Sequence, residues 1–385
     1  MKADVAVVGV GTMGSMALWR LAQRGISAIG FEQFGVGHDR GAAGGETRLF
    51  RTAYMEGPEY VPLLRAAYDG WRELERETRR HLLTLTGGLT IGDPDAETMR
   101  GVLESARSFD LEHLLLDGAA ARQRYPQHRL FPGEAMLLEH QAGFLRPEIA
   151  VQAATRRAEE LGAVVHRHAR VQSIEVDPNG VAIRVGNEEH HVDRVLVTAG
   201  PWTGSLLGEW DERLSVRRLV MTWFAADDPA LFTPQRFPVF TRRREDVNIF
   251  GLPSVDGYTV KVSLATDYGD VADPDALDLD VPPAELMMIT SVVGELLPGL
   301  VPEPLRVSAY MDAFTPAHRA VVGPAEDLPN TILMCGFSGH GFKLAPVVGE
   351  VAADLLMHGE TDHEIGCFDV PGGQLAPVPS SARRA

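Results

Sequence analysis

The first 32 residues show short apolar runs on either side of one amphipathic stretch, a pattern typical of a strand–helix–strand unit. The run Val5–Val8 is short and rich in β-branched residues, which indicates a buried parallel strand. A helical pattern follows from about residue 13 to 23, and Gly25 is placed to end it. A second apolar run, 27–31, predicts the next strand and leads into Glu32.

A second group of strands far downstream returns to the same kind of unit. The segment DRVLVTAGPWTGSLL (193–207) indicates a buried strand that runs into a helix. Before it, 163–185 predicts a strand, a turn and a strand, with Asn179-Gly180 as the hairpin turn. FAD proteins of the glutathione-reductase type return to their nucleotide domain in this way, whereas NAD dehydrogenases usually build the second half directly after the first.

Length and composition fit an ordinary globular protein of two domains, with 385 residues, 45% hydrophobic and 23% charged. The formal net charge of −17 argues against nucleic acid and anionic membranes as partners. Two cysteines, Cys335 and Cys367, fit neither a disulfide framework nor a metal site. We therefore expect the protein to lie in the reducing cytoplasm and to bind no metal. The first residues run into a strand and no apolar run reaches ~20 residues, so we expect neither a signal peptide nor a membrane segment. The Pro-, Ser- and Gly-rich tail, 371–385, is expected to be mobile.

A glycine motif follows the first strand. Gly9, Gly11 and Gly14 have G-x-G-x-x-G spacing, for a tight turn, for close approach of backbone to a pyrophosphate, and for close packing of helix on strand. The N-terminus of the helix offers unpaired N–H groups and a positive dipole end to phosphates. Glu32 can accept hydrogen bonds from both ribose hydroxyls and would repel a 2′-phosphate, which argues against NADP. The motif predicts dinucleotide binding and leaves FAD and NAD open.

Several longer segments are more specific than this motif. They are VVGVGTMG, GGETRLFRTAY, EYVPLLRAAYDGWRELE, TGGLTIG, VLVTAGPW and GFSGHGFKLAPVVGEV, and they spread from residue 1 to about 370. Through them the chain resembles the monomeric sarcosine oxidase family, which includes N-methyltryptophan oxidase and related glycine-oxidase-like enzymes. The resemblance implies an FAD enzyme that oxidises the C–N bond of an amino acid and passes the electrons to oxygen, giving hydrogen peroxide.

The expected fold class is α/β with two domains, a glutathione-reductase-type FAD-binding Rossmann domain and a substrate domain with a mixed or antiparallel sheet. Strand patterns at 219–226, 236–243 and 259–266, and an amphipathic helix at 282–300, are assigned to the substrate domain. Substrate would lie between that sheet and the flavin. The expected domain boundaries are 1–85, 145–215 and 305–370 for the FAD domain, and 86–144 and 216–304 for the substrate domain.

Two arginines carry the first part of the expected chemistry. Arg48 and Arg51 stand three residues apart and would share one face of a helix or turn. Their apolar flanks, which include Tyr54, indicate that the pair is buried, and a buried arginine needs an anion. The resemblance implies that Arg48 lies over the flavin ring, and that Arg51 binds the substrate carboxylate together with Lys343.

The turn GFSGHGFK, 336–343, and one further lysine complete this chemistry. The resemblance implies that backbone N–H groups at Gly339 and Gly341 reach the flavin C2 carbonyl, and that the positive end of the next helix favours the reduced flavin. Lys261 is either an edge-strand lysine or an inward charge facing a polar cavity. It matches the oxygen-activating lysine of the family, which would make the chain an oxidase rather than a dehydrogenase.

The chain departs from the family at several positions. The flavin-linking cysteine of many members aligns with Tyr310, and Cys335 lies on the strand before the 336–343 turn, so we expect FAD to be held non-covalently and to be a weaker oxidant. Two pocket histidines align with Gly44 and Ala265, and a pocket tyrosine aligns with Asp312. These changes predict a pocket larger than one for sarcosine, with room for a long or second cationic substituent near Asp312. The alternative is that Asp312 pairs with an arginine and does not meet the substrate.

We therefore expect an FAD-dependent oxidase of an N-substituted amino acid, such as an N-methyl or N-carboxymethyl amine, that acts as a monomer or a simple homodimer on its substrate and O2. A flavin dehydrogenase with another electron acceptor, and a redox-silent or NAD-binding protein, remain as alternatives. The candidate catalytic residues are Lys261 and Arg48, and the candidate substrate-binding residues are Arg51, Lys343, Asp312, Gly44 and Ala265. The candidate cofactor-binding residues are Gly9, Val10, Gly11, Thr12, Met13, Gly14, Glu32, Gln33, Arg40, Gly45, Thr47, Arg48, Val171, Ala199, Gly200, Trp202, Gly339, His340, Gly341, Phe342 and Lys343.

Overall fold

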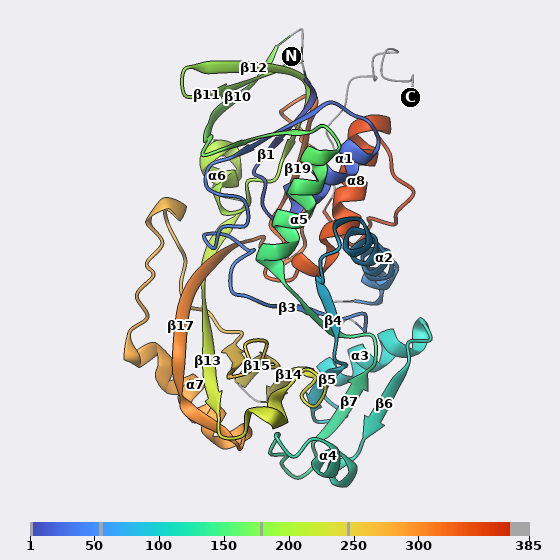
Figure 1. Cartoon of the computed structure of the whole chain (residues 1–385), viewed down its shortest axis with the longest axis vertical. Coiled ribbons are helices and arrows are strands. Elements are labelled where there is room, and N and C mark those ends of the chain that lie inside the picture. Colours follow the sequence, from blue (N-terminus) through green and yellow to red (C-terminus); the bar gives the residue numbers. More distant parts are fainter. Residues whose placement is uncertain (1–2, 54–56, 178–179, 245–246, 370–385) are drawn as a thin grey trace.

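A computed structural model describes residues 3–53, 57–177, 180–244 and 247–369. Tyr54, Asn179 of the expected hairpin turn, and the tail 371–385 lie outside the described residues. Figure 1 shows two sheets stacked along the long axis of the molecule, with helices α1, α5 and α8 beside the upper one. Among the described residues, no helix has the length and apolar character that crossing a membrane requires.

The first sheet contains the predicted strand–helix–strand unit. Its strand order is β10-β11-β12-β1-β2-β9, with β19 paired to β12 and β18 paired to β19. The pairs β12–β1, β1–β2, β2–β9 and β12–β19 are parallel, whereas β10–β11, β11–β12 and β18–β19 are antiparallel. The strands predicted within 163–185 and 193–207 therefore join this sheet as predicted. The strands are β1 (Ala3–Val8), β2 (Ala28–Glu32), β9 (Val164–Arg167), β10 (Val171–Asp177), β11 (Gly180–Val185), β12 (Glu188–Val197), β18 (Val321–Pro324) and β19 (Thr331–Cys335).

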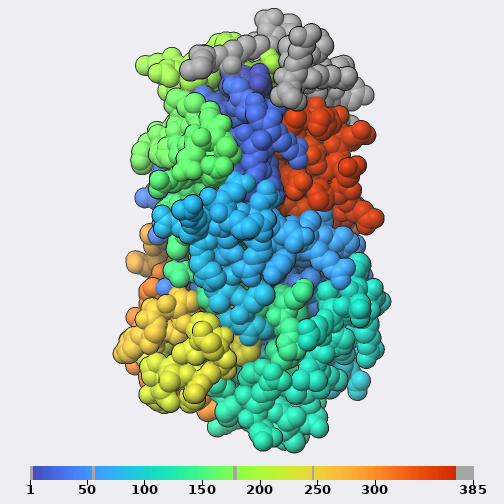
Figure 2. Space-filling model, turned by 45° about the vertical axis from the view of Figure 1, so that its right-hand side comes forward, coloured from blue at the N-terminus to red at the C-terminus, as the bar shows by residue number. Residues whose placement is uncertain are grey.

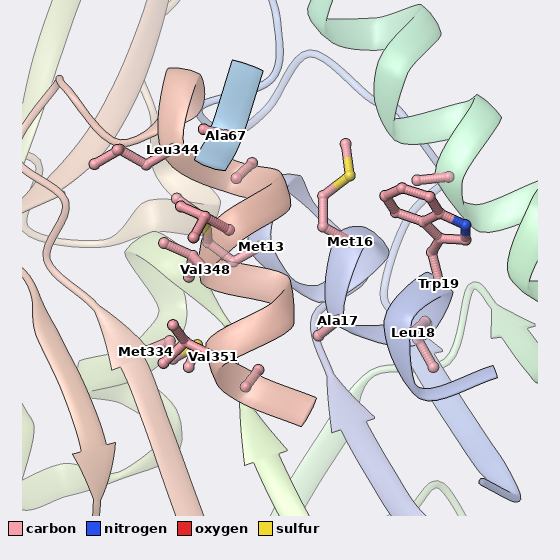
Figure 3. Packing of buried hydrophobic residues seen from close by; sticks show 14 of the residues in the cluster. Met13, Met16, Ala17, Leu18, Trp19, Ala67, Met334, Leu344, Val348 and Val351 are labelled. Carbon is pink, nitrogen blue, oxygen red and sulfur yellow. The ribbon is translucent and has the colours of Figure 1, made fainter. Parts of the chain in front are cut away.

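Helix α1 (Thr12–Gln23) is buried between α8 (Ala345–His358) and α5 (Pro147–Glu160). Figure 3 shows Ala17 of α1 turned toward helix α8. The two helices are so close that a Cβ built on Gly349 would lie 2.6 Å from the backbone carbon of Met16. This packing fixes the direction of α1, and with it the direction of its N-terminus.

The second sheet has the order β17-β13-β16-β15-β14-β5-β7-β6. Its pairs are antiparallel except β14–β5, which is parallel, so the sheet is mixed. The predicted strands at 219–226, 236–243 and 259–266 correspond to β13, β14 and β16, and the predicted helix at 282–300 to α7. The elements are β5 (Gly88–Gly92), β6 (His113–Leu116), β7 (Ala135–Glu139), β13 (Ser215–Ala226), β14 (Val239–Arg244), β15 (Val247–Leu252), β16 (Thr259–Leu264), β17 (Leu300–Phe314), α3 (Glu97–Ser108), α4 (Gly118–Arg124) and α7 (Pro283–Leu296).

A small third sheet, β3-β8-β4, lies between the two large ones (Figure 1). Its strands are β3 (Arg48–Phe50), β4 (Leu83–Leu85) and β8 (Gly143–Leu145). The expectation that Arg48 and Arg51 share a face of a helix or turn is wrong, because Arg48 begins strand β3 and Arg51 follows its end. In extended chain, residues three apart point to opposite sides, so the two guanidinium groups face different surroundings.

Helix α2 (Val61–Thr78) covers the middle of one face of the molecule, where the blue surface in Figure 2 lies between the red C-terminal helix and the teal segment. It packs on α8 and α5. A short helix, α6 (Thr203–Leu206), follows β12 as expected. The residue boundaries given above for the two domains stay a prediction.

The α1–α8 contact gives a test of the fold. Gly349→Ala places a methyl group against the backbone of Met16, so we expect unfolding free energy to fall by about 1–3 kcal/mol. Urea unfolding followed by circular dichroism measures this change. Gly366→Ala is the control, because a Cβ there meets nothing within 4 Å. Equal midpoints for the two variants would show that α1 and α8 are less tightly packed than described.

Candidate active site

A cavity of about 400 Å³ opens at the carboxyl ends of β1, β2, β12 and β19, where ligands bind in open α/β sheets. Its lining joins segments from both ends of the chain. Many of these residues were predicted from the sequence to hold a cofactor. Those that line the cavity are Gly9, Gly11, Thr12, Met13, Glu32, Gln33, Arg48, Val171, Ala199, Gly200, Trp202, Gly339, Gly341 and Phe342, and the expected substrate residue Asp312 lines it too.

One end of the cavity is formed by the glycine motif. Gly9 has a φ of 91°, and a Cβ on Gly14 would lie 2.0 Å from the Gly9 carbonyl oxygen, so both positions require glycine. A Cβ on Gly11 would meet nothing within 4 Å, which leaves open space in front of the α1 N-terminus. The Glu32 carboxylate accepts hydrogen bonds from the Val10 and Phe34 N–H groups at 3.1 and 2.8 Å. It therefore fixes the glycine loop, and burial raises the pKa of Glu32.

Seven expected cofactor residues are not part of this lining. Val10 and Thr47 are buried, and Arg40 places its guanidinium 4.7 Å from the centre of the Phe34 ring. Other residues line the cavity without having been predicted from the sequence, among them His38 and Phe337. The seven are Val10, Gly14, Arg40, Gly45, Thr47, His340 and Lys343.

Arg48 and Asp312 also line the cavity. The Arg48 guanidinium donates to the carbonyls of Thr47 and Ala42 at 3.0 and 2.9 Å. Asp312 accepts from the backbone N–H groups of Ala313 and Gly339, each at 2.9 Å. Burial raises the pKa of Asp312 to about 6, although these hydrogen bonds and Arg48 act in the other direction. The Gly339 N–H, which was expected to meet the flavin carbonyl, is thus engaged by a carboxylate.

Lys261 is an inward charge and not an edge-strand lysine, because β16 lies between β13 and β15. Its side chain is 2% exposed, and Nζ donates to the carbonyls of Gly45 and Thr47 at 2.9 and 3.1 Å. Burial, and next the charge of Arg48, hold the pKa of Lys261 well below its usual value.

One signal for this lysine is visible in the composition. The chain has three lysines, at positions 2, 261 and 343, among 36 basic residues. Both lysines in the described part of the chain are buried at the candidate site. At these two positions a compact ammonium group would act differently from the guanidinium of the far more common arginine.

Lys343 is held by the turn that precedes α8. Its Nζ donates to the His340 carbonyl at 2.8 Å, and its own carbonyl accepts from Trp71 Nε1 at 3.0 Å. The Trp71 ring stacks on Phe342, with ring centroids 5.7 Å apart. Helix α2 therefore fixes the conformation of this turn.

Arg51 is buried between β3 and the second sheet. Its Nη1 donates to Thr241 Oγ1 at 2.6 Å, its Nη2 to Thr90 Oγ1 at 2.5 Å, and its Nε lies 3.7 Å from Glu139 Oε2. The anion predicted for this arginine from the sequence was a substrate carboxylate. The structure supplies an internal anion, Glu139, whose pKa is raised by burial. This partner was missed because it is 88 residues away on β7, with nothing local to link the two.

Gly44 and Tyr310, two positions that were predicted to differ from the family, lie against each other. A Cβ on Gly44 would lie 2.5 Å from Tyr310 Cε1, so the Tyr310 ring occupies space that a side chain at position 44 would need. The two departures are therefore coupled. Cys335 lines the cavity from the end of β19. Ala265 is exposed just after β16 and is not part of the cavity lining.

Comparisons with known proteins identify the family of this chain. The family model described as FAD dependent oxidoreductase matches residues 4–355. Monomeric sarcosine oxidase of Streptomyces avermitilis is 35% identical over 97% of this chain and 99% of its own, and N-methyl-L-tryptophan oxidase of Salmonella dublin is 30% identical over 93% and 95%. In fold, the chain is similar to NikD, an amino acid oxidase essential for nikkomycin biosynthesis, with a TM-score of 0.85, 21% identity, and coverage of 96% of this chain and 98% of NikD. The chain therefore belongs to the FAD-dependent oxidoreductase family, as do the monomeric sarcosine oxidases and N-methyl-L-tryptophan oxidases that it matches over nearly its full length.

Proposed function

We propose that this protein oxidises the C–N bond of an N-substituted amino acid and delivers the electrons to O2. The amine loses two electrons and two protons to become an imine, and O2 takes up both to become hydrogen peroxide. Water then splits the imine, giving formaldehyde from an N-methyl group or glyoxylate from an N-carboxymethyl group. The observation that carries the proposal is the meeting of a dinucleotide cavity, lined in part by Arg48, with the buried cation Lys261, whose Nζ binds the loop just before Arg48.

The residues present fit FAD. The open space at Gly11 and the N-terminus of α1 suit a pyrophosphate, and Glu32 suits a ribose. The part of the same cavity that Arg48 and Phe342 line would hold the flavin ring. When bound, FAD supplies the two-electron chemistry between the amine and oxygen.

Three basic side chains would bind the substrate and stabilise charge on oxygen. Arg51 and Lys343 would bind the substrate carboxylate and so orient the carbon that is oxidised. Lys261 would stabilise the negative charge that develops on oxygen as it is reduced. Asp312 carries a negative charge above its pKa of about 6, and would favour substrates with a cationic substituent.

A peroxide-coupled screen tests this function, with N-methyl, N-carboxymethyl and cyclic imino acids and with basic side chains on some of them. Peroxide from at least one class is the expected result. Bleaching of the flavin without peroxide would favour a dehydrogenase with another acceptor. A colourless preparation without flavin absorbance would favour a redox-silent nucleotide-binding protein.

Exchange of the two buried lysines should separate the two half-reactions. Lys261→Met is expected to slow reoxidation of the reduced flavin by orders of magnitude and to change its reduction little, because the cation acts on oxygen. Lys343→Met is the matched variant and should show the opposite pattern, because that cation would bind the substrate. Stopped-flow absorbance with anaerobic reduction and separate oxygen mixing measures both. Equal losses in both half-reactions for Lys261→Met would refute its assigned role.

Arg51→Ala should raise KM for a carboxylate substrate tens- to thousands-fold, since a buried charge partner lost typically costs about 2–5 kcal/mol. The same variant should lower the melting temperature, because Glu139 stays buried beside it. Measuring the amide analogue of the substrate separates these effects, because the amide has no charge for Arg51 to bind. If KM for the acid and the amide rise equally, Arg51 does not contact the carboxylate.

We propose non-covalent FAD, because Tyr310 has no thiol to form a thioether and the buried Cys335 belongs to strand β19. Precipitation with trichloroacetic acid should therefore leave all yellow colour in the supernatant. Colour in the pellet would show a covalent link, and mass spectrometry of peptides would locate it. The two cysteines are free and buried, which suits our proposal of a cytoplasmic location. Monomer or simple homodimer stays a prediction.

A further inference from the structure

The carbonyls that hold Lys261 belong to an unusual turn. The Thr47 N–H donates to the Gly45 carbonyl at 2.7 Å, which closes a three-residue turn around Glu46. Glu46 has a φ of 69°, and γ-turns with positive φ are rare and strained. The carbonyls on either side of Glu46 are the two that accept from Lys261 Nζ. A strained turn of this kind persists only when its surroundings hold it.

Three elements hold Glu46 in this conformation. Its Oε2 accepts from Trp223 Nε1 on β13 at 3.0 Å and from Arg306 Nη2 on β17 at 2.9 Å. Its backbone N–H donates to Glu148 Oε1 on α5 at 2.8 Å. The Arg306 guanidinium also lies 3.8 Å from the centre of the Trp223 ring. Glu46 thus links the loop after β2 to α5, β13 and β17.

The charges around Lys261 give Glu46 a second consequence. Arg48 and Arg306 disfavour the ammonium form of Lys261, whereas Glu148 and Glu46 favour it. Burial disfavours it more than any of these. A lysine that has to be cationic in this place needs anions nearby, and Glu46 is connected directly to the turn that binds Nζ.

We propose that Glu46 is the positioning residue of Lys261: its carboxylate, held by Trp223 and Arg306, fixes the turn whose carbonyls bind Nζ and helps keep Nζ charged. This rests on the proposed function in one respect only, the role of Lys261 toward oxygen. A carboxylate that merely joined the loop to the second sheet would affect stability and leave the charge of Lys261 unchanged.

The three lysines of the chain make the charge of Lys261 measurable. Protein labelled with 15N-lysine gives three Nζ signals, and Lys261→Met identifies the one of interest. In Glu46→Gln, which keeps an acceptor for Trp223 but loses the charge, we expect the titration midpoint of Lys261 to fall by about one unit. The Lys343 midpoint should stay in place. Glu303→Gln, an exposed change of equal charge on β17, is the control and should move neither signal.

Glu46→Asp restores the charge and should return the Lys261 midpoint at least half-way toward that of the wild type. Trp223→Phe keeps every charge and removes the indole donor, and we expect a fall smaller than in Glu46→Gln and larger than in Glu303→Gln. It also provides the measurement if Glu46→Gln does not fold. A Lys261 midpoint unchanged in Glu46→Gln, or in Trp223→Phe where that variant is needed, overturns the proposal.

The holoenzyme supplies a second readout. Above both midpoints, a one-unit fall lowers the charged fraction of Lys261 about tenfold, so flavin reoxidation in Glu46→Gln should slow about tenfold. Flavin reduction by substrate should stay within about twofold. If the midpoint falls but no amine reduces even the wild type, the proposed function fails and the placement of Lys261 by Glu46 stands. If the midpoint falls and reoxidation is unchanged, Glu46 has no part in the reaction with oxygen.

Discussion

The site depends on burying several cations without cancelling their charge. Arg48 and Lys261 satisfy their hydrogen bonds with backbone carbonyls, and Lys343 donates to the His340 carbonyl. A carbonyl oxygen satisfies a donor but brings no formal negative charge, so the charges that favour the ammonium form of Lys261 come from Glu148 and Glu46 instead. An arrangement of cations held by carbonyls stabilises an anion brought in from outside, whether a carboxylate or charge that develops during a reaction. It stands inside a chain with a formal net charge of −17, so the acidic surface says little about the interior.

Arg51 differs from these cations because a carboxylate lies beside its guanidinium. It has an internal carboxylate, Glu139, and two threonine hydroxyls around its guanidinium. A substrate carboxylate would therefore have to share Arg51 with Glu139. The burial that raises the pKa of Glu139 makes this possible, since a protonated Glu139 would leave the charge of Arg51 available. In the proposed function, specificity for an acid would then depend on the pair and not on the arginine alone.

What could be predicted from sequence was what is local. The strand–helix–strand unit and the glycine positions each follow from spacing or pattern within a few residues, whereas the pattern around Lys261 fitted an edge strand as well as an inward charge. Arg48 was misplaced on a helix or turn because three residues carry too little periodicity to separate a short strand from a turn. The partners Glu139 and Glu148 could not be predicted, because each meets its partner across about a hundred residues. The scarcity of lysine is the one further sequence feature that could have pointed to Lys261 and Lys343.

The coupling of Gly44 and Tyr310 shows how such a site changes as a unit. Loss of a side chain at position 44 makes room for the Tyr310 ring, which packs with Met221 and Trp223. Trp223 in turn binds Glu46, and Glu46 lies in the turn that holds Lys261. A change at Tyr310 therefore reaches Lys261 through three contacts. Replacing Tyr310 by cysteine would leave a cavity beside Trp223, so such a variant would also require a larger residue at position 44 to keep the Glu46 turn in place.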